Sequence, residues 1–187
     1  MTVPVELDRQ FRDVAASEGL LDVAYDVVDS PIGPLLVGVS ERGVCRIAFE
    51  PEPEAELDLL AARIGPRVLR AGRRVEPVRR QLDEYFERRR QSFELDYDLA
   101  GLPAFQREVL HELVRVPYAE TSTYGALAAR VGRPRAARAV GGALNRNPVP
   151  IVVPCHRIVG STGSLVGYGG GLERKQALLE FEGAVLF

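Results

Sequence analysis

The residues best suited to chemistry lie in the segment NPVPIVVPCHRIVG (residues 147–160), where Cys155 is followed by His156 and Arg157. A cysteine attacks as its thiolate, and neighbouring cations favour that form. Three prolines in the segment restrict the backbone and would hold the thiol in a fixed place. The pattern indicates a nucleophilic cysteine, although a lone cysteine is more often an inert part of the core. We apply that second interpretation to Cys45, which lies in an apolar alternating stretch.

The charge of the chain is unevenly distributed. Residues 104–187 carry 10 basic and 6 acidic side chains, a balance of +4, whereas residues 1–103 carry 14 basic and 20 acidic side chains, a balance of −6. No Asp or Glu occurs between Glu120 and Glu173, and six arginines fall in that interval: Arg130, Arg133, Arg135, Arg138, Arg146 and Arg157. A basic, acid-free stretch fits a polyanion such as DNA, although an arginine-rich composition can also produce such a cluster by chance.

The acid-free stretch contains a candidate helix-turn-helix. In TSTYGALAARVG, Ser122 or Thr123 can cap a helix that Gly132 can end in the left-handed conformation. A turn then leads into a second predicted helix over residues 135–146. Two adjacent glycines inside that helix cost about 1 kcal/mol each relative to alanine, unless the helix packs closely on another surface. That surface could be a DNA minor groove or another helix of the protein, and the sequence leaves both open.

The remaining elements must position these segments. Three strand-like runs separated by turn residues predict an antiparallel meander, and they span residues 22–28, 35–40 and 44–49. Two helical patterns and one further alternating, strand-like run follow at residues 53–64, 74–90 and 92–99.

Helical patterns dominate beyond residues 100–103. We therefore predict an α+β protein with a small N-terminal α/β domain over residues 1–102, which contains the antiparallel sheet. Within it, residues 1–20 form an amphipathic or frayed extension to which we assign no role. A mainly helical C-terminal domain over residues 103–187 contains the helix-turn-helix.

Composition narrows the classes of protein further. No run approaches the roughly 18 apolar residues of a membrane helix, and the acidic N-terminus is unlike a signal peptide. We expect a cytoplasmic protein, associated with the nucleoid when bound to DNA, and no membrane partner. Two cysteines and two histidines are too few for a disulfide framework or a structural zinc site, so we expect no metal and no cofactor.

The motif Pro154-Cys155-His156-Arg157 resembles the signature of the O6-alkylguanine-DNA alkyltransferases, also called methylated-DNA–protein-cysteine methyltransferases. The resemblance continues through the C-terminal domain in the family's order and spacing. The matching segments are residues 105–106, 116–118, 123–125, 136–141, 147–148, 167–171 and 179–183. The N-terminal part matches less sharply, mainly through SPIGP at residues 30–34.

The resemblance implies repair of DNA by direct reversal. One alkyl group from O6-alkylguanine would pass irreversibly to Cys155 in a single turnover, after minor-groove binding and base flipping; O4-methylthymine is a further candidate substrate. His156 and Glu182 would complete a proton relay through an ordered water. Tyr124 would donate a proton to N3 of the leaving guanine, and Asn147 would link the recognition helix to the active-site segment. From the residues alone, Glu182 is an ordinary surface acid and Tyr124 a core residue of its helix.

The resemblance also implies which residues meet DNA. Arg138 would enter the base stack in place of the extruded nucleotide. The other residues assigned to DNA binding are Arg135, Ala137, Gly141 and Ser161. The residues assigned to the substrate pocket are Val153, Pro154, Ile158, Tyr168 and Gly169. The implied partner is double-stranded DNA containing O6-alkylguanine, bound by a monomer without an obligate protein partner.

Three positions depart from the family pattern. Ala119 stands where the family often has glycine, Thr123 where serine is usual, and Gly169 where some members have a serine that contacts the guanine oxygen. The last departure puts in question which bulky adducts the pocket accepts.

Three other functions fit parts of the sequence. A non-enzymatic lesion binder of the alkyltransferase-like type has tryptophan at the cysteine position, whereas this chain has Cys155 and no tryptophan. A thiol hydrolase would need Cys155 and His156 to face each other, but adjacent residues of an extended segment point apart. A plain transcriptional regulator would leave the Pro-Cys-His-Arg motif unexplained.

Overall fold

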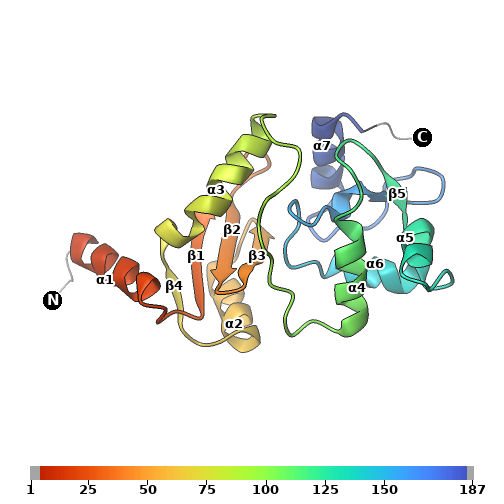
Figure 1. The fold of residues 1–187 in the computed structure, drawn as a ribbon. Helices are drawn as coiled ribbons and strands as arrows, with labels where there is room; N and C mark the ends of the chain where they lie inside the picture. The colour runs from red at the N-terminus through yellow and green to blue at the C-terminus, as the bar shows by residue number, and fades with distance from the viewer. Residues whose placement is uncertain (1–4, 185–187) are drawn as a thin grey trace. The chain divides into compact units, whose positions relative to one another are not determined.

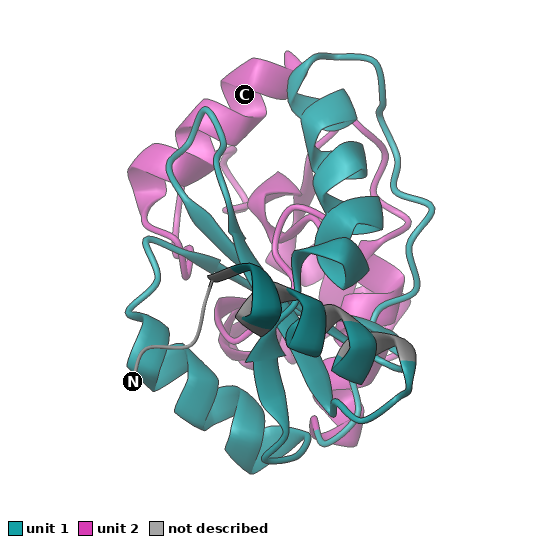
Figure 2. Ribbon diagram, turned by 90° about the vertical axis from the view of Figure 1, so that its left-hand side faces the viewer, with its two compact units in different colours: residues 1–101 teal, residues 102–187 magenta. Residues whose placement is uncertain are grey.

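A computed structural model describes residues 5–184 of the chain, and within the first helix it describes only some of the side chains. The chain divides into two compact units, Met1–Gly101 and Leu102–Phe187 (Figure 2). Unit 1 combines a sheet with helices, and unit 2 is mainly helical (Figure 1). This arrangement confirms the predicted α+β class. No helix in the described part of the chain is long and apolar enough to cross a membrane.

Unit 1 is built on a four-stranded sheet with the strand order β3-β2-β1-β4. Its strands are β1 (Val23–Val28), β2 (Leu35–Ser40), β3 (Gly43–Phe49) and β4 (Val68–Arg70). β1, β2 and β3 form the predicted antiparallel meander, in which Leu36 lies opposite Val27 on one side and Ala48 on the other. β4 pairs with β1 in parallel. No sequence signal predicts β4, because its three residues are at most half-buried and show no alternation.

Two helices, α2 (Pro53–Arg63) and α3 (Gly72–Phe86), contact the strands of this unit. α3 packs against β1 and β2 and buries apolar residues at helical spacing: Val75, Val78, Leu82 and Tyr85. It ends at Phe86 rather than at residue 90, and Arg88 beyond it has a left-handed φ of 61°. Leu60 of α2 packs in one core cluster with Cys45. Burial there raises the pKa of Cys45 to about 12, which fits an inert core thiol.

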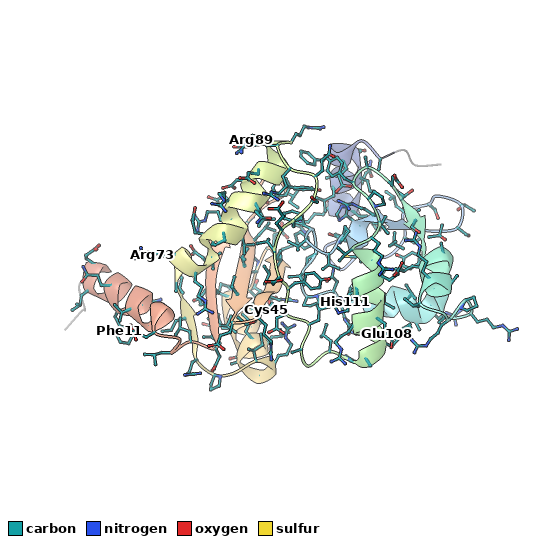
Figure 3. All side chains as sticks on the ribbon, viewed as in Figure 1. Phe11, Cys45, Arg73, Arg89, Glu108 and His111 are labelled. Carbon is teal, nitrogen blue, oxygen red and sulfur yellow. The ribbon has the colours of Figure 1, made fainter. Side chains whose placement is uncertain are left out.

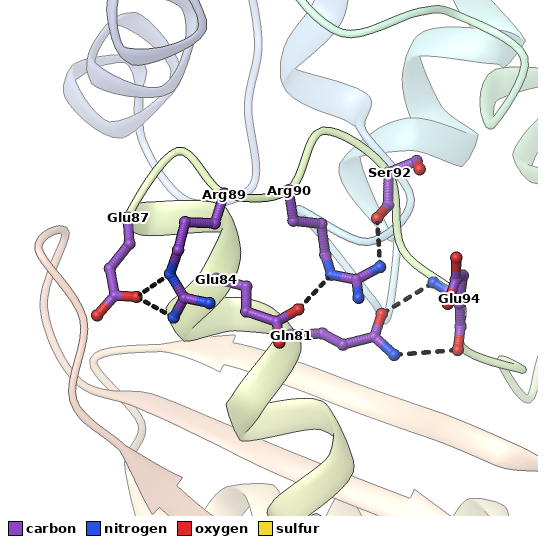
Figure 4. Close-up of polar contacts among 7 residues, drawn as sticks. All are labelled: Gln81, Glu84, Glu87, Arg89, Arg90, Ser92 and Glu94. Atoms are coloured by element: carbon purple, nitrogen blue, oxygen red, sulfur yellow. Dashed lines mark hydrogen bonds and ion pairs between the residues drawn. The ribbon is translucent and has the colours of Figure 1, made fainter.

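Residues 92–99 do not form the predicted strand. A single bridge pairs Tyr97 with Val44 of β3. Earlier in the segment a side chain takes the place of a partner strand: Gln81 of α3 donates from Nε2 to the Glu94 carbonyl (3.1 Å) and accepts the Glu94 N–H at Oε1 (2.8 Å) (Figure 4). The backbone groups of Glu94 are thus satisfied without a ladder, which alternation in the sequence cannot reveal.

The N-terminal extension contains α1 (Val5–Ser17), whereas residues 1–4 of the predicted segment lie outside the described residues. Ala15 of α1 is buried in a small apolar cluster with Leu21, Ala24 and Ala71. Phe11 is 65% exposed (Figure 3). Ala15 therefore anchors the C-terminal end of α1 to its unit, while the apolar side chain of Phe11 stays exposed.

Unit 2 carries all the residues predicted for the site. Its elements in chain order are α4 (Ala104–Leu113), β5 (Ser122–Thr123), α5 (Tyr124–Arg130), α6 (Ala137–Asn145), the 3-10 helix η1 (Cys155–Arg157), β6 (Ile158–Val159) and α7 (Leu172–Glu182). α4 packs against α5 and α6, and these two pack against each other. β5 and β6 pair in parallel, and η1 packs against α7. The cysteine segment is therefore held by a strand pairing on one side and a helix on the other.

Candidate active site

Cys155 opens η1 directly after Pro154. The parallel pairing of β5 with β6 sets Thr123 opposite Val159. This brings the cysteine segment to the N-terminal end of α5, where Tyr124 is the first helical residue. The turn of η1 replaces the extended backbone expected here, and Cys155 within it is only 6% exposed.

Asn147 holds the thiol from the side of α6, two residues after that helix ends. Its Nδ2 donates to the Val153 carbonyl (2.7 Å) and to Cys155 Sγ (3.2 Å). Its Oδ1 accepts the Val149 N–H (3.1 Å). One buried amide therefore connects two points of the segment between α6 and η1 with the thiol at the start of η1.

Glu182, the last residue of α7, is the centre of a buried charge cluster. Its Oε1 lies 2.9 Å from His156 Nε2 and accepts Arg157 Nη2 (2.9 Å), while its Oε2 accepts Arg157 Nε (2.9 Å). Arg157 Nη1 also donates to the Val116 carbonyl (2.8 Å). η1 is thus fastened to α7 by a bidentate arginine–carboxylate pair, a strong form of charge-assisted hydrogen bonding.

Ala119 completes the cluster through its backbone. Its N–H points to Glu182 Oε2 at 3.3 Å. Its φ is 61°, a left-handed conformation that costs a non-glycine residue on the order of 1 kcal/mol. The glycine that the family often has at this position would adopt the same backbone without that cost.

The cluster determines which ring nitrogen of His156 carries the proton. Burial raises the pKa of Glu182, but hydrogen bonds from His156 and Arg157 outweigh it and lower the pKa to about 2. Burial lowers the pKa of His156, so the ring is neutral at neutral pH. A carboxylate only accepts, so Nε2 holds the ring proton and Nδ1 is an acceptor. Nδ1 is buried and has no hydrogen-bond partner among the described residues. It has the lone pair that a general base requires.

The thiol is not activated by its charged neighbours, and the sequence-based prediction on this point is wrong. Burial raises the pKa of Cys155 to about 11, although a hydrogen bond from Asn147 acts in the opposite direction. The two groups expected to favour the thiolate are a neutral His156 ring and an Arg157 whose charge is matched by Glu182. Cys155 is therefore a thiol at neutral pH and needs a base during the reaction.

Tyr124 and Lys175 meet at the loop that precedes α7. The Tyr124 hydroxyl donates to the carbonyls of Val166 (2.9 Å) and Gly167 (3.2 Å). Lys175 Nζ donates to the same two carbonyls, at 2.7 and 3.4 Å. No role for Lys175 follows from the sequence-based reasoning. The one feature of the sequence that could have indicated Lys175 is its spacing of seven residues from Glu182, which places both residues on one face of α7.

The predicted helix-turn-helix is present, with shorter helices than expected. Thr123 caps α5 by accepting the Ala126 N–H at 3.1 Å, and Gly132 has a left-handed φ of 72° beyond its end. α6 begins at Ala137 rather than at Arg135, because a hydrogen-bonded turn occupies the intervening residues.

The arginines of the acid-free stretch divide into two groups. Three are paired with acids of unit 2: Arg130 with Glu112, Arg133 with Glu108, and Arg157 with Glu182. The other three are exposed and form no ion pair with the described residues: Arg135, Arg138 and Arg146. Within the acid-free stretch, the unpaired positive charge is therefore concentrated on α6 and the turns at its ends.

The other residues assigned to DNA binding differ in their surroundings. Ala137 is half-buried, and Ser161 is exposed in the loop after β6. A Cβ on Gly141 would lie 3.7 Å from the Tyr124 ring, so α6 packs closely on α5 at this point. Packing inside the protein, one of the two surfaces left open by the sequence, is thus present at Gly141.

The residues assigned to the substrate pocket lie at different depths. Val153, Pro154 and Ile158 are buried, Tyr168 is half-buried and Gly169 is exposed. A Cβ on Gly169 would lie 2.9 Å from the Asn145 carbonyl. A serine at this position has no room unless the loop or the end of α6 moves. Among the side chains that the structure describes, no three His, Cys, Asp or Glu gather as they would to hold a metal ion.

Gln106 of α4 supports the end of α6 and was not singled out for this role from the sequence. Its Nε2 donates to the carbonyls of Ala143 (3.2 Å) and Arg146 (2.8 Å). A helix leaves such C-terminal carbonyls without intrahelical partners. The buried amide therefore stabilises the segment that leads from α6 to Asn147.

Two family descriptions match the chain and together cover most of it. Residues 104–184 match the 6-O-methylguanine DNA methyltransferase, DNA binding domain. Residues 23–99 match the 6-O-methylguanine DNA methyltransferase, ribonuclease-like domain.

Individual proteins are similar over a comparable length. The methylated-DNA–protein-cysteine methyltransferase of Methanosarcina barkeri is 40% identical over 158 residues, which cover 84% of this chain and 96% of the relative. The crystal structure of Mycobacterium tuberculosis O6-methylguanine methyltransferase has 39% identity and a TM-score of 0.74, covering 86% of this chain and 93% of that one. The structure of Mycobacterium tuberculosis OGT in complex with DNA has 38% identity and a TM-score of 0.73, covering 85% and 92%.

Proposed function

The chain belongs to the 6-O-methylguanine DNA methyltransferase family, and we propose that it repairs alkylated DNA by moving the alkyl group from O6 of guanine onto Cys155, once per chain. The observation that carries this proposal is the set of polar groups around the Cys155 thiol. Asn147 donates to Sγ at 3.2 Å, and the adjacent His156 presents a buried Nδ1 acceptor. Such a thiol is protonated at rest and has a base in the next residue, as a single-use nucleophile requires.

In the proposed transfer, Cys155 Sγ forms a bond to the alkyl carbon while the bond from that carbon to O6 breaks. The thiol proton passes through an ordered water to His156 Nδ1, and Glu182 stabilises the imidazolium that forms. Guanine leaves with the electron pair and takes a proton at N3 from Tyr124. The proton held by His156 then restores the Tyr124 hydroxyl through water, so that in balance an alkyl group moves to the protein and the thiol proton is replaced by one on guanine. The alkyl group is then held in a thioether, from which the Cys155 thiolate leaves far less readily than guanine left the alkyl carbon. Cys155 is therefore consumed.

Unit 2 binds DNA, since it matches the DNA binding domain of the family and a solved relative of the chain is in complex with DNA. We further propose that the ligand is duplex DNA containing O6-alkylguanine, approached by α6 through the minor groove, and that one chain acts as a monomer. The unpaired, exposed Arg138 near the start of α6 supports this orientation. Sedimentation of the complex tests the stoichiometry: one chain per lesion is expected.

Intact-mass measurement after incubation with an O6-methylguanine duplex tests the function. We expect one added methyl group per chain, located on Cys155, and no further turnover with excess substrate. Cys155→Ala is expected to bind the same duplex and to gain no mass. Turnover beyond one equivalent, or a methyl group on Cys45, would contradict the mechanism. Binding of the lesion without any gain of mass by the unaltered chain would indicate a lesion-binding protein instead.

Arg138→Ala is expected to slow transfer from duplex DNA by about tenfold to a hundredfold, because stacking of a planar side chain on bases contributes about 1–3 kcal/mol. Transfer from the free base O6-methylguanine should change little, since a free base requires no extrusion. Single-turnover rates on both substrates measure the difference. Arg146→Ala is the matched control, because it removes another exposed charge, at the other end of α6. Equal losses on duplex and free base would rule out the stacking role.

A further inference from the structure

Lys175 is a buried cation to which the proposed transfer assigns no step. It is the only lysine of the chain and is 0% exposed. Burial lowers its pKa to about 8. Burying an ammonium group is costly unless the group forms hydrogen bonds. Lys175 Nζ forms them with two carbonyls of one loop, those of Val166 and Gly167. Any role of Lys175 must therefore act through the conformation of this loop.

The loop over residues 160–171 contains no helix or strand. Backbone hydrogen bonds of its own close turns over residues 160–164 and 168–171, and donors from other elements reach the part between them. Lys175 and Tyr124 both donate to the carbonyls of Val166 and Gly167. Lys175 Nζ lies 5.8 Å from the centroid of the Tyr124 ring. A carbonyl oxygen has two lone pairs and can accept from both donors at once. The two side chains therefore share one pair of acceptors.

Sharing matters because the Tyr124 hydroxyl is occupied in this structure. To donate to N3 of guanine, it must leave the two loop carbonyls. Val166 and Gly167 are exposed loop residues, so without another donor no side chain would hold their carbonyls just as the base occupies the pocket. Lys175 is already in contact with both.

We propose that Lys175 is a positioning residue that holds the Val166 and Gly167 carbonyls when the Tyr124 hydroxyl turns from them to the base. The loop then keeps its conformation while Tyr124 protonates the leaving guanine. The proposal rests on the proposed function, because it requires Tyr124 to act on guanine. It adds a residue of α7 to those that determine the rate.

A double-mutant cycle tests the shared acceptors. Lys175→Met keeps an unbranched side chain of similar length but removes the donors. It is expected to slow single-turnover transfer from an O6-methylguanine duplex at least about tenfold, the effect of losing one charge-assisted hydrogen bond. In the Tyr124→Phe background the same change is expected to have a much smaller effect, because the hydroxyl no longer has to turn. Independent, multiplicative effects would overturn the proposal.

Arg174→Met is the matched control within α7. Arg174 Nη1 donates to the Gly170 carbonyl of the same loop (3.0 Å) but not to the acceptors that Tyr124 uses. Its effect is expected to be small and to combine independently with Tyr124→Phe. If Arg174→Met shows the same coupling, Lys175 has only the general role of supporting the loop. Thermal unfolding of each variant checks that it is folded. If Lys175→Met does not fold, Lys175→Gln, which keeps an N–H donor, takes its place in the cycle.

A second measurement separates the hydrogen-bond donor from the bulk of the side chain. Lys175→Gln keeps an N–H donor, so it is expected to recover part of the transfer rate that Lys175→Met loses. Equal losses in both variants would overturn the proposal. If the unaltered chain accepts no methyl group, the proposed function fails; if it does and the cycle shows no coupling, only the role of Lys175 fails.

Discussion

Glu182→Gln is expected to lower the free energy of unfolding by about 3–5 kcal/mol and to abolish measurable methyl transfer. The carboxylate accepts two bonds from Arg157 and faces the N–H of His156, all at 2.9 Å. An amide of the same shape turns an N–H group toward one of these donors and leaves the buried guanidinium without a counter-charge. Urea unfolding and single-turnover transfer measure the two effects.

The matched control is Glu180→Gln on the same helix. Glu180 is exposed, and its carboxylate accepts a hydrogen bond from Gln176 Nε2 (2.8 Å). Its replacement should change the free energy of unfolding by no more than about 0.5 kcal/mol. Comparable losses in both variants would mean that the buried cluster contributes nothing special to stability.

The stability difference between the unaltered chain and Glu182→Gln should depend on pH. The pKa of Glu182 is about 2 in the folded chain, against an ordinary value of 4.5. A lowered pKa stabilises the fold at pH above the ordinary value, and this contribution is lost as the pH falls toward the folded pKa. The two proteins should therefore differ most near neutral pH and converge as the pH falls from 4.5 toward 2. A difference that stays constant over that range would contradict the assignment of the charge to Glu182.

Asn147→Ala is expected to slow methyl transfer by about tenfold to a hundredfold or slightly more. The amide donates to Sγ at 3.2 Å, and a hydrogen bond to a charged group contributes about 1.5–3 kcal/mol, which is realised when the thiolate forms. The variant also loses the bonds to the Val153 carbonyl and the Val149 N–H. The free energy of unfolding should fall by about 1–3 kcal/mol as these buried groups are left unsatisfied.

Asn145→Ala is the control for this change, because Asn145 is an exposed asparagine at the end of α6, two residues before Asn147. Its replacement should leave the transfer rate near that of the unaltered chain. The pH dependence of transfer should also move to higher pH in Asn147→Ala alone, since the lost bond lowers the pKa of Cys155. A normal rate in Asn147→Ala would show that the amide only shapes the loop.

Several elements could be predicted from the sequence because their signals are local. Alternation and turn residues indicate β1, β2 and β3, and the cap at Thr123 with the glycine at 132 brackets α5. The order and spacing of motifs around Cys155 were sufficient to identify the family, since both are properties of the chain rather than of its packing.

Other features could not be predicted because they depend on partners distant in the sequence. β4 is too short to show a pattern and exists through its pairing with β1. Residues 92–99 alternate like a strand, yet the Gln81 amide satisfies their backbone at Glu94. Lys175 has no motif, and its relation to Tyr124 exists only through carbonyls of a loop that both side chains reach.

The sequence by itself indicated Cys155 as the proposed alkyl acceptor, because it stands in a motif whose residue types and spacing resemble the signature of one family. Only the tertiary structure decided the state of the Cys155 thiol. Burial raises the pKa of Cys155 to about 11. The two residues that the sequence indicated as activators of the thiol, His156 and Arg157, are both bound to Glu182 instead. A pKa depends on the solvent and charges that surround a group in space, and adjacent letters in a sequence specify neither.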